Sequence, residues 1–193
     1  MLRVEGLPCP GGTLTFEVAP GQCLGLWSHG ADDLAPVSQM IAALRSAAPG
    51  RVAIDRWDSE RDAAQFRAAV SVYLPKAADR RSTALEHVHA IARVRGSRDS
   101  AAAALRRLHI SPDAPMASAA VRSGAALAAV LVSGAPVLVL HEPFTELSHD
   151  TRGSAIEWIL ALARTTTSIV VSGREERDLR AVSTLVIKVG ATR

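Results

Sequence analysis

The chain of 193 residues has few cysteines and few aromatic residues. Cys9 and Cys23 are too few for a disulfide framework or a cysteine-based zinc site, so we expect a reduced, cytoplasmic setting. Aromatic residues make up 4% of the chain, which leaves its alanine-rich helices with few large side chains to fill the space between them. We therefore expect a thinly packed fold, or a fold that a partner completes.

Long apolar runs are also missing. No stretch of roughly 18 apolar residues occurs, which predicts no membrane-spanning helix, and Met1–Gly6 does not resemble a signal peptide. The length predicts one domain, or one domain with a subdomain. The net charge is +3 and the pI is near 9.4. The rise in arginine over 80–107 is more typical of solvated helix faces than of a nucleic-acid surface.

Lysine occurs at two positions, Lys76 and Lys188. A loop that wraps a triphosphate uses backbone N–H groups and a lysine that reaches the β- and γ-phosphate oxygens. No lysine precedes Lys76. A lysine-bearing phosphate loop near the N-terminus is therefore excluded.

The spacing of apolar residues predicts strands that alternate with helices, and so an α/β fold with a parallel sheet. Gly11 and Gly12 predict a hairpin between the first two strands. The expected strands are 2–4, 14–18, 23–27, 51–54, 137–140, 168–171 and 184–189. The expected helices are 37–46, which would end at Pro49–Gly50, and 83–95, 100–108, 119–132, 151–163 and 175–181. The helices between two strand regions predict a helical subdomain at 77–132 within a core of 1–76 and 133–193.

The most informative segment is 137–148, VLVLHEPFTELS. Its continuous apolar run is typical of a buried parallel strand, and the strand ends at a carboxylate followed by a turn. The segment resembles the Walker B and D-loop segment of ABC transporter ATPases, which is usually four apolar residues followed by DEPTSALD. In this alignment His141 takes the position of the magnesium-binding Asp, and Ser148 takes the position of the D-loop Asp.

The resemblance to the ABC transporter ATPases extends over nearly the whole chain. Segments 2–7 and 16–22 resemble the opening strands, 71–76 the approach to the Q-loop, 83–96 the helical subdomain, and 125–140 the helix that leads into Walker B. The order and spacing of these segments favour the assignment. It implies a P-loop NTPase-like (RecA-like) parallel sheet with N-terminal antiparallel strands and a helical subdomain insert.

The segment that matches Walker A lacks the residues that hold a triphosphate. The positions concerned are Ser28, His29, Gly30, Asp32 and Asp33, with Asp33 at the lysine position, or Leu34 there if the register shifts by one. Two unit charges about 4 Å apart repel by about 4 kcal/mol near a protein surface, so the aspartates oppose a bound phosphate. They are also suited to cap the helix that follows. Both interpretations imply loss of nucleotide.

The other motif positions are altered as well. Lys76 stands at the Q-loop Gln, Ser118 is the one signature residue retained in 117–121, and Gly173 stands at the switch His. His141 cannot replace a carboxylate at magnesium, which prefers oxygen ligands. Glu142 keeps the position of the general base, but base chemistry without metal or phosphate clamps contributes little. We therefore expect Glu142 to be a vestigial residue of a turn, and we expect neither ATP nor magnesium to be bound.

These losses predict a degenerate ABC-type subunit, a pseudo-ATPase that serves as a scaffold, docking or regulatory subunit. The resemblance implies an ABC-type ATPase partner or a homodimer, with an integral-membrane permease as a further candidate at the inner face of the membrane. One alternative is a divergent ABC-type ATPase that still binds or hydrolyses ATP. Another, less favoured, is a P-loop relative that binds nucleic acid through 80–107.

Overall fold

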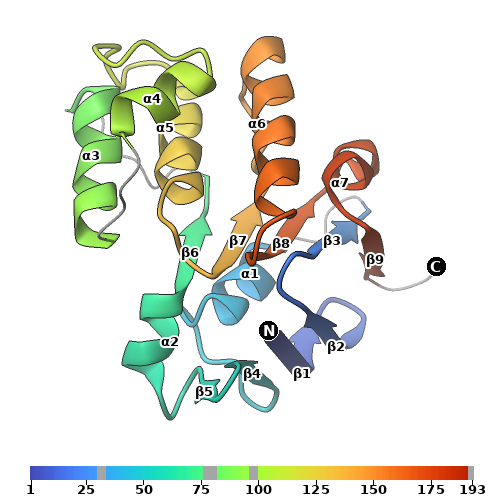
Figure 1. The fold of residues 1–193 in the computed structure, drawn as a ribbon. Helices are drawn as coiled ribbons and strands as arrows, with labels where there is room; N and C mark the ends of the chain where they lie inside the picture. Colours follow the sequence, from blue (N-terminus) through green and yellow to red (C-terminus); the bar gives the residue numbers. More distant parts are fainter. Residues whose placement is uncertain (30–33, 76–81, 96–99, 191–193) are drawn as a thin grey trace. The chain divides into compact units, whose positions relative to one another are not determined.

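A computed structural model describes residues 1–29, 34–75, 82–95 and 100–190 (Figure 1). The chain divides into two compact units. Unit 1 comprises Met1–Val72, Ala135–Glu142 and Leu162–Arg193, and unit 2 comprises Tyr73–Gly134 and Pro143–Ala161. This grouping places 143–161 in the helical unit, whereas the division made from the sequence kept that segment in the core. No helix among the described residues is long and apolar enough to cross a bilayer.

An antiparallel sheet of unit 1 has the strand order β2-β1-β4-β5. Its strands are β1 (Leu2–Cys9), β2 (Gly12–Val18), β4 (Arg51–Ile54) and β5 (Trp57–Asp58). The predicted hairpin is confirmed, since β1 and β2 pair. Its turn is Pro10–Gly11, and Gly12 is the first residue of β2. The register shifts between Val4 and Leu7, where Gly6 has a φ of 57°. Gly50 packs against this bulge so closely that a Cβ there would lie 2.6 Å from the Gly6 carbonyl oxygen.

The second sheet has the strand order β6-β7-β8-β3-β9. The strands are β6 (Val70–Tyr73), β7 (Val137–His141), β8 (Ser168–Gly173), β3 (Cys23–Ser28) and β9 (Leu185–Val189). All residues of β7 and β8 are buried, as the apolar runs 137–140 and 169–171 require in a parallel sheet covered on both faces. The predicted α/β fold with a parallel sheet and N-terminal antiparallel strands is confirmed.

The helices of unit 1 are α1 (Ala35–Ile41), α2 (Ala63–Ala69) and α7 (Glu176–Val182). Val37 and Ile41 of α1 join the core cluster formed with both sheets. The predicted helix 37–46 was too long at its C-terminus. It ends five residues earlier than Ser46 because Ala43 adopts a φ of 54°, which no right-handed helix can continue. Helix α2 and strands β5 and β6 were not predicted.

The helices of unit 2 are α3 (Ala84–Arg95), α4 (Ala101–Arg107), α5 (Ala119–Leu131) and most of α6 (His149–Leu162). Helix α3 begins at a capping box, in which the Thr83 backbone N–H donates to Glu86 Oε2 at 2.8 Å and the Glu86 N–H donates to Thr83 Oγ1 at 3.2 Å. Ser100 caps α4 in a similar way by accepting from the Ala103 N–H. The predicted helices 83–95, 100–108 and 119–132 are confirmed to within one residue at each end.

Candidate functional site at the carboxyl edge of the parallel sheet

Strands β3, β7 and β8 run parallel, so their carboxyl ends meet at one edge of the sheet. Ser28, His141 and Gly173 are the last residues of these strands. In open α/β sheets, ligands bind outside the carboxyl ends of the strands, where the following helices leave on opposite faces. A ligand site, if present, is therefore expected at this edge and at the start of α1.

A buried chain of hydrogen bonds joins three elements at this edge. His141 Nδ1 of β7 lies 2.9 Å from Ser172 Oγ of β8, and Ser172 Oγ lies 2.8 Å from Ser38 Oγ of α1. The three residues are 7%, 1% and 0% exposed. A hydroxyl can donate one hydrogen bond while accepting another, so Ser172 serves both neighbours. Each group thus finds a protein partner in a place where an unsatisfied polar atom would be costly.

Glu142 is held just beyond this chain of hydrogen bonds. Its backbone adopts a φ of 49°, and its N–H donates to the Ser172 carbonyl at 2.8 Å. Its Oε1 lies 3.6 Å from Arg174 Nε, forming an ion pair. Its Oε2 lies 3.7 Å from the position that a Cβ on Gly173 would take. The carboxylate therefore lies over the glycine that stands at the switch-His position and is paired with the next side chain.

These residues do not fit a magnesium site. Magnesium needs an octahedral set of oxygen ligands, usually with one or two carboxylates. Here β7 ends in an imidazole whose Nδ1 is engaged by Ser172, and Glu142 is paired with Arg174. Within the described parts of the chain, no group of three or more His, Cys, Asp or Glu side chains could hold a metal ion. Asp32 and Asp33 lie outside the described residues.

The described part of the Walker A position has no phosphate-binding chemistry either. Ser28 is fully buried at the end of β3, His29 is exposed, and Gly30 lies outside the described residues. Leu34 occupies the N-cap of α1, makes no side-chain cap bond and is 2% exposed within the apolar core. The N-cap of α1 is therefore the apolar Leu34, and the prediction that Asp32 or Asp33 caps this helix is wrong.

One of the two lysines does lie beside this edge, packed on an aromatic ring. Lys188 of β9 is opposite Trp27 of β3, and its Nζ lies 5.5 Å from the centroid of the Trp27 ring. The indole Nε1 donates to the Arg174 carbonyl at 3.0 Å, and the His29 ring lies 5.7 Å from the indole, edge-on. The indole thereby links β3, β9 and the segment that follows β8.

Solved structures with closely similar backbones identify the fold. The ATP-binding subunit of an ABC transporter superposes with a TM-score of 0.85 at 15% identity, covering 98% of this chain and 86% of that chain. A dimeric ATP-binding cassette in a post-hydrolysis state with ADP and Pi superposes at 0.82 and 14% identity, covering 98% and 94%. A bacterial Atm1-family ABC exporter with ATP bound superposes at 0.81 and 16% identity, covering 98% of this chain and 38% of that chain.

The chain has the fold of an ABC ATPase nucleotide-binding domain. No protein-family model matches the sequence, and no curated protein matches it either. The likeness at these identities is one of fold, and the chemistry of the chain has to be inferred from its own residues.

Two more positions of the ABC-type fold act as helix caps in unit 2. Ser118, the retained signature serine, accepts from the Val121 N–H at 3.2 Å and so caps α5. Arg122 Nη1 donates to the carbonyls of Met116, at 3.1 Å, and Ala117. Ser148, at the D-loop Asp, accepts from the Thr151 N–H at 3.3 Å where α6 begins. Lys76, at the Q-loop Gln, lies outside the described residues.

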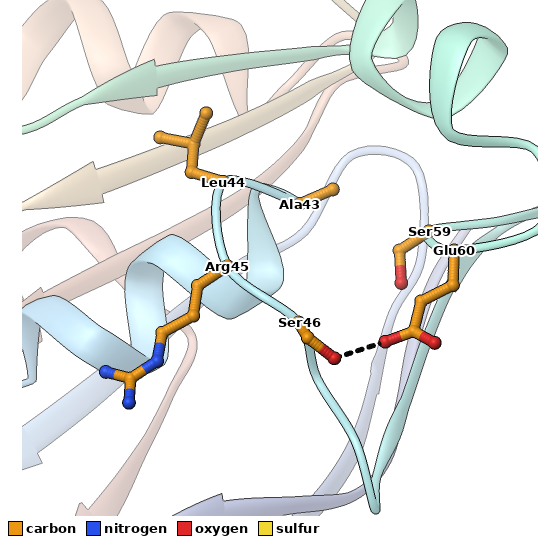
Figure 2. A pocket seen from close by; sticks show the side chains of 6 residues that line it. All are labelled: Ala43, Leu44, Arg45, Ser46, Ser59 and Glu60. Atoms are coloured by element: carbon orange, nitrogen blue, oxygen red, sulfur yellow. Dashed lines mark hydrogen bonds between the residues drawn. The ribbon is translucent and has the colours of Figure 1, made fainter.

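A groove of about 400 Å³ follows α1, but it is unrelated to the carboxyl edge (Figure 2). It starts at Ala43, past the last residue of α1, so the length of that helix separates it from the end of β3. Ser46 Oγ donates to Glu60 Oε1 at 2.6 Å, and Arg45 points away from this pair. With one cation and one carboxylate, its lining has no preference for a charged ligand.

Sequence reasoning singled out His141, Glu142 and Gly173, which the structure brings together. It missed the two serines of the network and the arginines Arg122 and Arg174. Ser172 interrupts the apolar run of β8, and a hydroxyl in a fully buried strand needs a partner, which is a usable signal. The arginines carried no such signal, because most arginines in this chain are exposed.

Proposed function

We propose that this chain is a non-hydrolysing ABC-type subunit, a pseudo-ATPase that acts as a scaffold, docking or regulatory subunit for another protein. The main support is the hydrogen-bonded chain of Ser38, Ser172 and His141. It puts an imidazole and two hydroxyl groups that are bonded to one another at the end of β7, where a metal-dependent site would need a carboxylate. A site that is complete without a ligand gains little from binding one.

The neighbouring charges support the same proposal. Phosphoryl transfer depends mainly on positioning and on cations that stabilise developing negative charge. Glu142, which keeps the general-base position, forms an ion pair with Arg174. Lys188 packs on Trp27, and Leu34 at the start of α1 is apolar and buried. Glu142 and Lys188 thus have partners within the chain, and Leu34 packs in the apolar core.

The proposed partners are an ABC-type ATPase subunit, a second copy of this chain or an integral-membrane permease. Support comes from the similar structures, one described as dimeric and another as an exporter. We propose that the chain binds such a partner peripherally at the inner face of the membrane.

A divergent ATPase is the second candidate, and one arrangement favours it. Trp27 is flanked by Lys188 and by the backbone of Arg174 at the carboxyl edge, which places an aromatic ring and two cations near the end of β3. An aromatic face and cations could contact a nucleotide without a lysine in the loop. This candidate requires the Arg174–Glu142 pair to open.

Calorimetric titration of ATP with magnesium into the purified chain, together with a phosphate-release assay, tests the proposal. We expect no heat of binding and no release above the protein-free rate. His141→Asp, which restores a carboxylate at the end of β7, is expected to stay inactive, with the exposed-site variant His149→Asp as its matched control. Micromolar binding, or turnover in either the parent chain or His141→Asp, would support the divergent ATPase instead.

A further inference from the structure

A second groove, of about 360 Å³, lies between α3 and α4 in unit 2. Its lining consists of Leu85, His89, Ala92, Arg93, Ser100, Ala101 and Ala102. Three of these residues are alanines, whose methyl groups cannot fill the space between two helices. The hollow is therefore a direct consequence of the alanine-rich sequence of this unit, and its volume falls within the range of about 300–1,000 Å³ typical of binding pockets.

The rim of this α3–α4 groove is polar with one sign of charge. His89 and Arg93 are exposed on α3, and their spacing of four residues places them on the same face of the helix. Among the described residues that line the groove, none carries a carboxylate. The nearest acid before them on α3, Glu86, is engaged in the capping box with Thr83. Val94, next to Arg93, is 87% exposed and adds apolar surface.

We propose that the α3–α4 groove is a docking site for an acidic amphipathic helix of a protein partner, which inserts an aliphatic side chain between α3 and α4. The groove lies between two helices, has an apolar floor and offers cationic and N–H donor groups at its rim. A helix laid into such a groove is held by aliphatic anchors, and its flanking carboxylates pair with the rim. The inference rests on the proposed docking function and names the chemistry of its partner.

A fluorescent amphipathic peptide built from glutamate and leucine is a suitable probe, with a lysine–leucine peptide of the same length as the charge control. Anisotropy titration of the full chain is expected to show saturable binding of the acidic peptide and much weaker binding of the basic one. Raising the salt concentration should weaken the acidic peptide's binding, because exposed charges at the rim are screened.

A pair of leucine substitutions tests the position of the site. Ala102→Leu places a larger side chain in the groove, whereas Ala103→Leu places it on the exposed face next to the groove. We expect Ala102→Leu to weaken binding about tenfold, the effect of losing about 1.4 kcal/mol, and Ala103→Leu to leave it unchanged. Matching circular dichroism spectra show that both variants are folded. Equal affinities in two folded variants would overturn the site.

A second pair tests the charge. Arg93→Glu reverses the rim, and Arg106→Glu makes the same change in the last turn of α4, outside the lining. We expect the Arg93→Glu variant to bind the basic peptide more tightly than the acidic one. The Arg106→Glu variant is expected to bind the acidic peptide more tightly, as the parent chain does. Binding of phosphatidylserine vesicles with no binding of the peptide would overturn the protein-partner proposal in favour of a lipid surface. ATP calorimetry on the same samples tests the two proposals separately. Absence of peptide binding would overturn the docking site and leave the pseudo-ATPase proposal standing. Binding of ATP would overturn the pseudo-ATPase proposal and leave the docking site standing.

Discussion

The carboxyl edge of unit 1 and the α3–α4 groove of unit 2 use their polar groups in opposite ways. At the edge, Ser38, Ser172 and His141 bond to one another, and Glu142 pairs with Arg174. At the groove, His89 and Arg93 stand on an exposed rim above small alanines. The polar groups described at the carboxyl edge are satisfied by one another, whereas the α3–α4 groove is left hollow.

The largest expected effect comes from two glycine substitutions, one in each unit, which compare how well the surroundings of each glycine can move to admit a methyl group. A Cβ on Gly50 would meet the backbone of Gly6 and Leu7 at 2.6–2.8 Å, which the paired strands cannot relieve. A Cβ on Gly124 would meet the tip of the Ile110 side chain, which can rotate away. In urea denaturation we expect Gly50→Ala to lose about 3 kcal/mol and Gly124→Ala to change by less than about 1 kcal/mol. Similar losses of unfolding free energy in both variants would show that the two sites admit a methyl group equally well.

The next prediction removes the centre of the buried network. Ser172→Ala takes the shared partner from His141 Nδ1 and Ser38 Oγ, and leaving buried polar groups short of a partner is expected to cost about 2 kcal/mol of unfolding free energy. Ser154→Ala is the matched control, because Ser154 bonds His109 Nε2 at 2.9 Å in an exposed position, where water can replace it. A smaller loss for Ser172→Ala than for the control would show that the network contributes little.

An acid-dependent effect is expected from the antiparallel sheet. The Arg51 guanidinium, 2.7 Å from Asp58, lowers the pKa of that carboxyl below its ordinary value. A lowered native pKa adds stability above the ordinary value, and this stability is lost as the pH falls through the native value. Arg51 is about half exposed, so we expect Asp58→Asn to cost less than about 1 kcal/mol at pH 7. The stability gap between parent and variant should narrow in chemical denaturation as the pH falls below the ordinary pKa of an aspartate, and a constant gap would contradict this assignment.

The smallest effect is expected at the switch-His position. A Cβ on Gly173 would meet Glu142 and Leu179 at ordinary contact distances of 3.7 Å or more, so Gly173→Ala should change stability by less than about 0.5 kcal/mol. The thermal midpoint, compared with that of Gly50→Ala, measures this. A large loss would mean that Glu142 needs the open space over the glycine.

The sequence predicted the elements whose apolar pattern is long and regular. The 14–18 part of strand β2 and helix α3 fell where expected, because burial alternates in the first and a capping box starts the second. Helix α2 was not predicted because it has seven residues and only two buried positions, which do not define a helical spacing of apolar residues. The early end of α1 depends on a positive φ at an alanine, and no residue preference announces it.

At the candidate site, the residue types were readable from the sequence, whereas their hydrogen-bond partners were not. The absence of a lysine before Lys76 and the histidine at position 141 can be read directly from the sequence. The partner of His141 could not be, because Ser172 and Ser38 are far apart in sequence and meet only through the pairing of β7 with β8 and the packing of α1. The residue at the end of a strand can be read from the sequence, and tertiary contacts decide which groups it bonds.

The three tryptophans offer a way to watch the two units separately. Trp27 and Trp57 belong to unit 1 and Trp158 to unit 2, and each has a Lys or Arg cation 4.7–5.6 Å from its ring centroid. A cation held over an indole shifts its fluorescence, and the shift vanishes once the contact is broken. Variants that keep one tryptophan each would therefore show, by emission wavelength during denaturation, whether the sheets and the helical unit unfold together or one after the other.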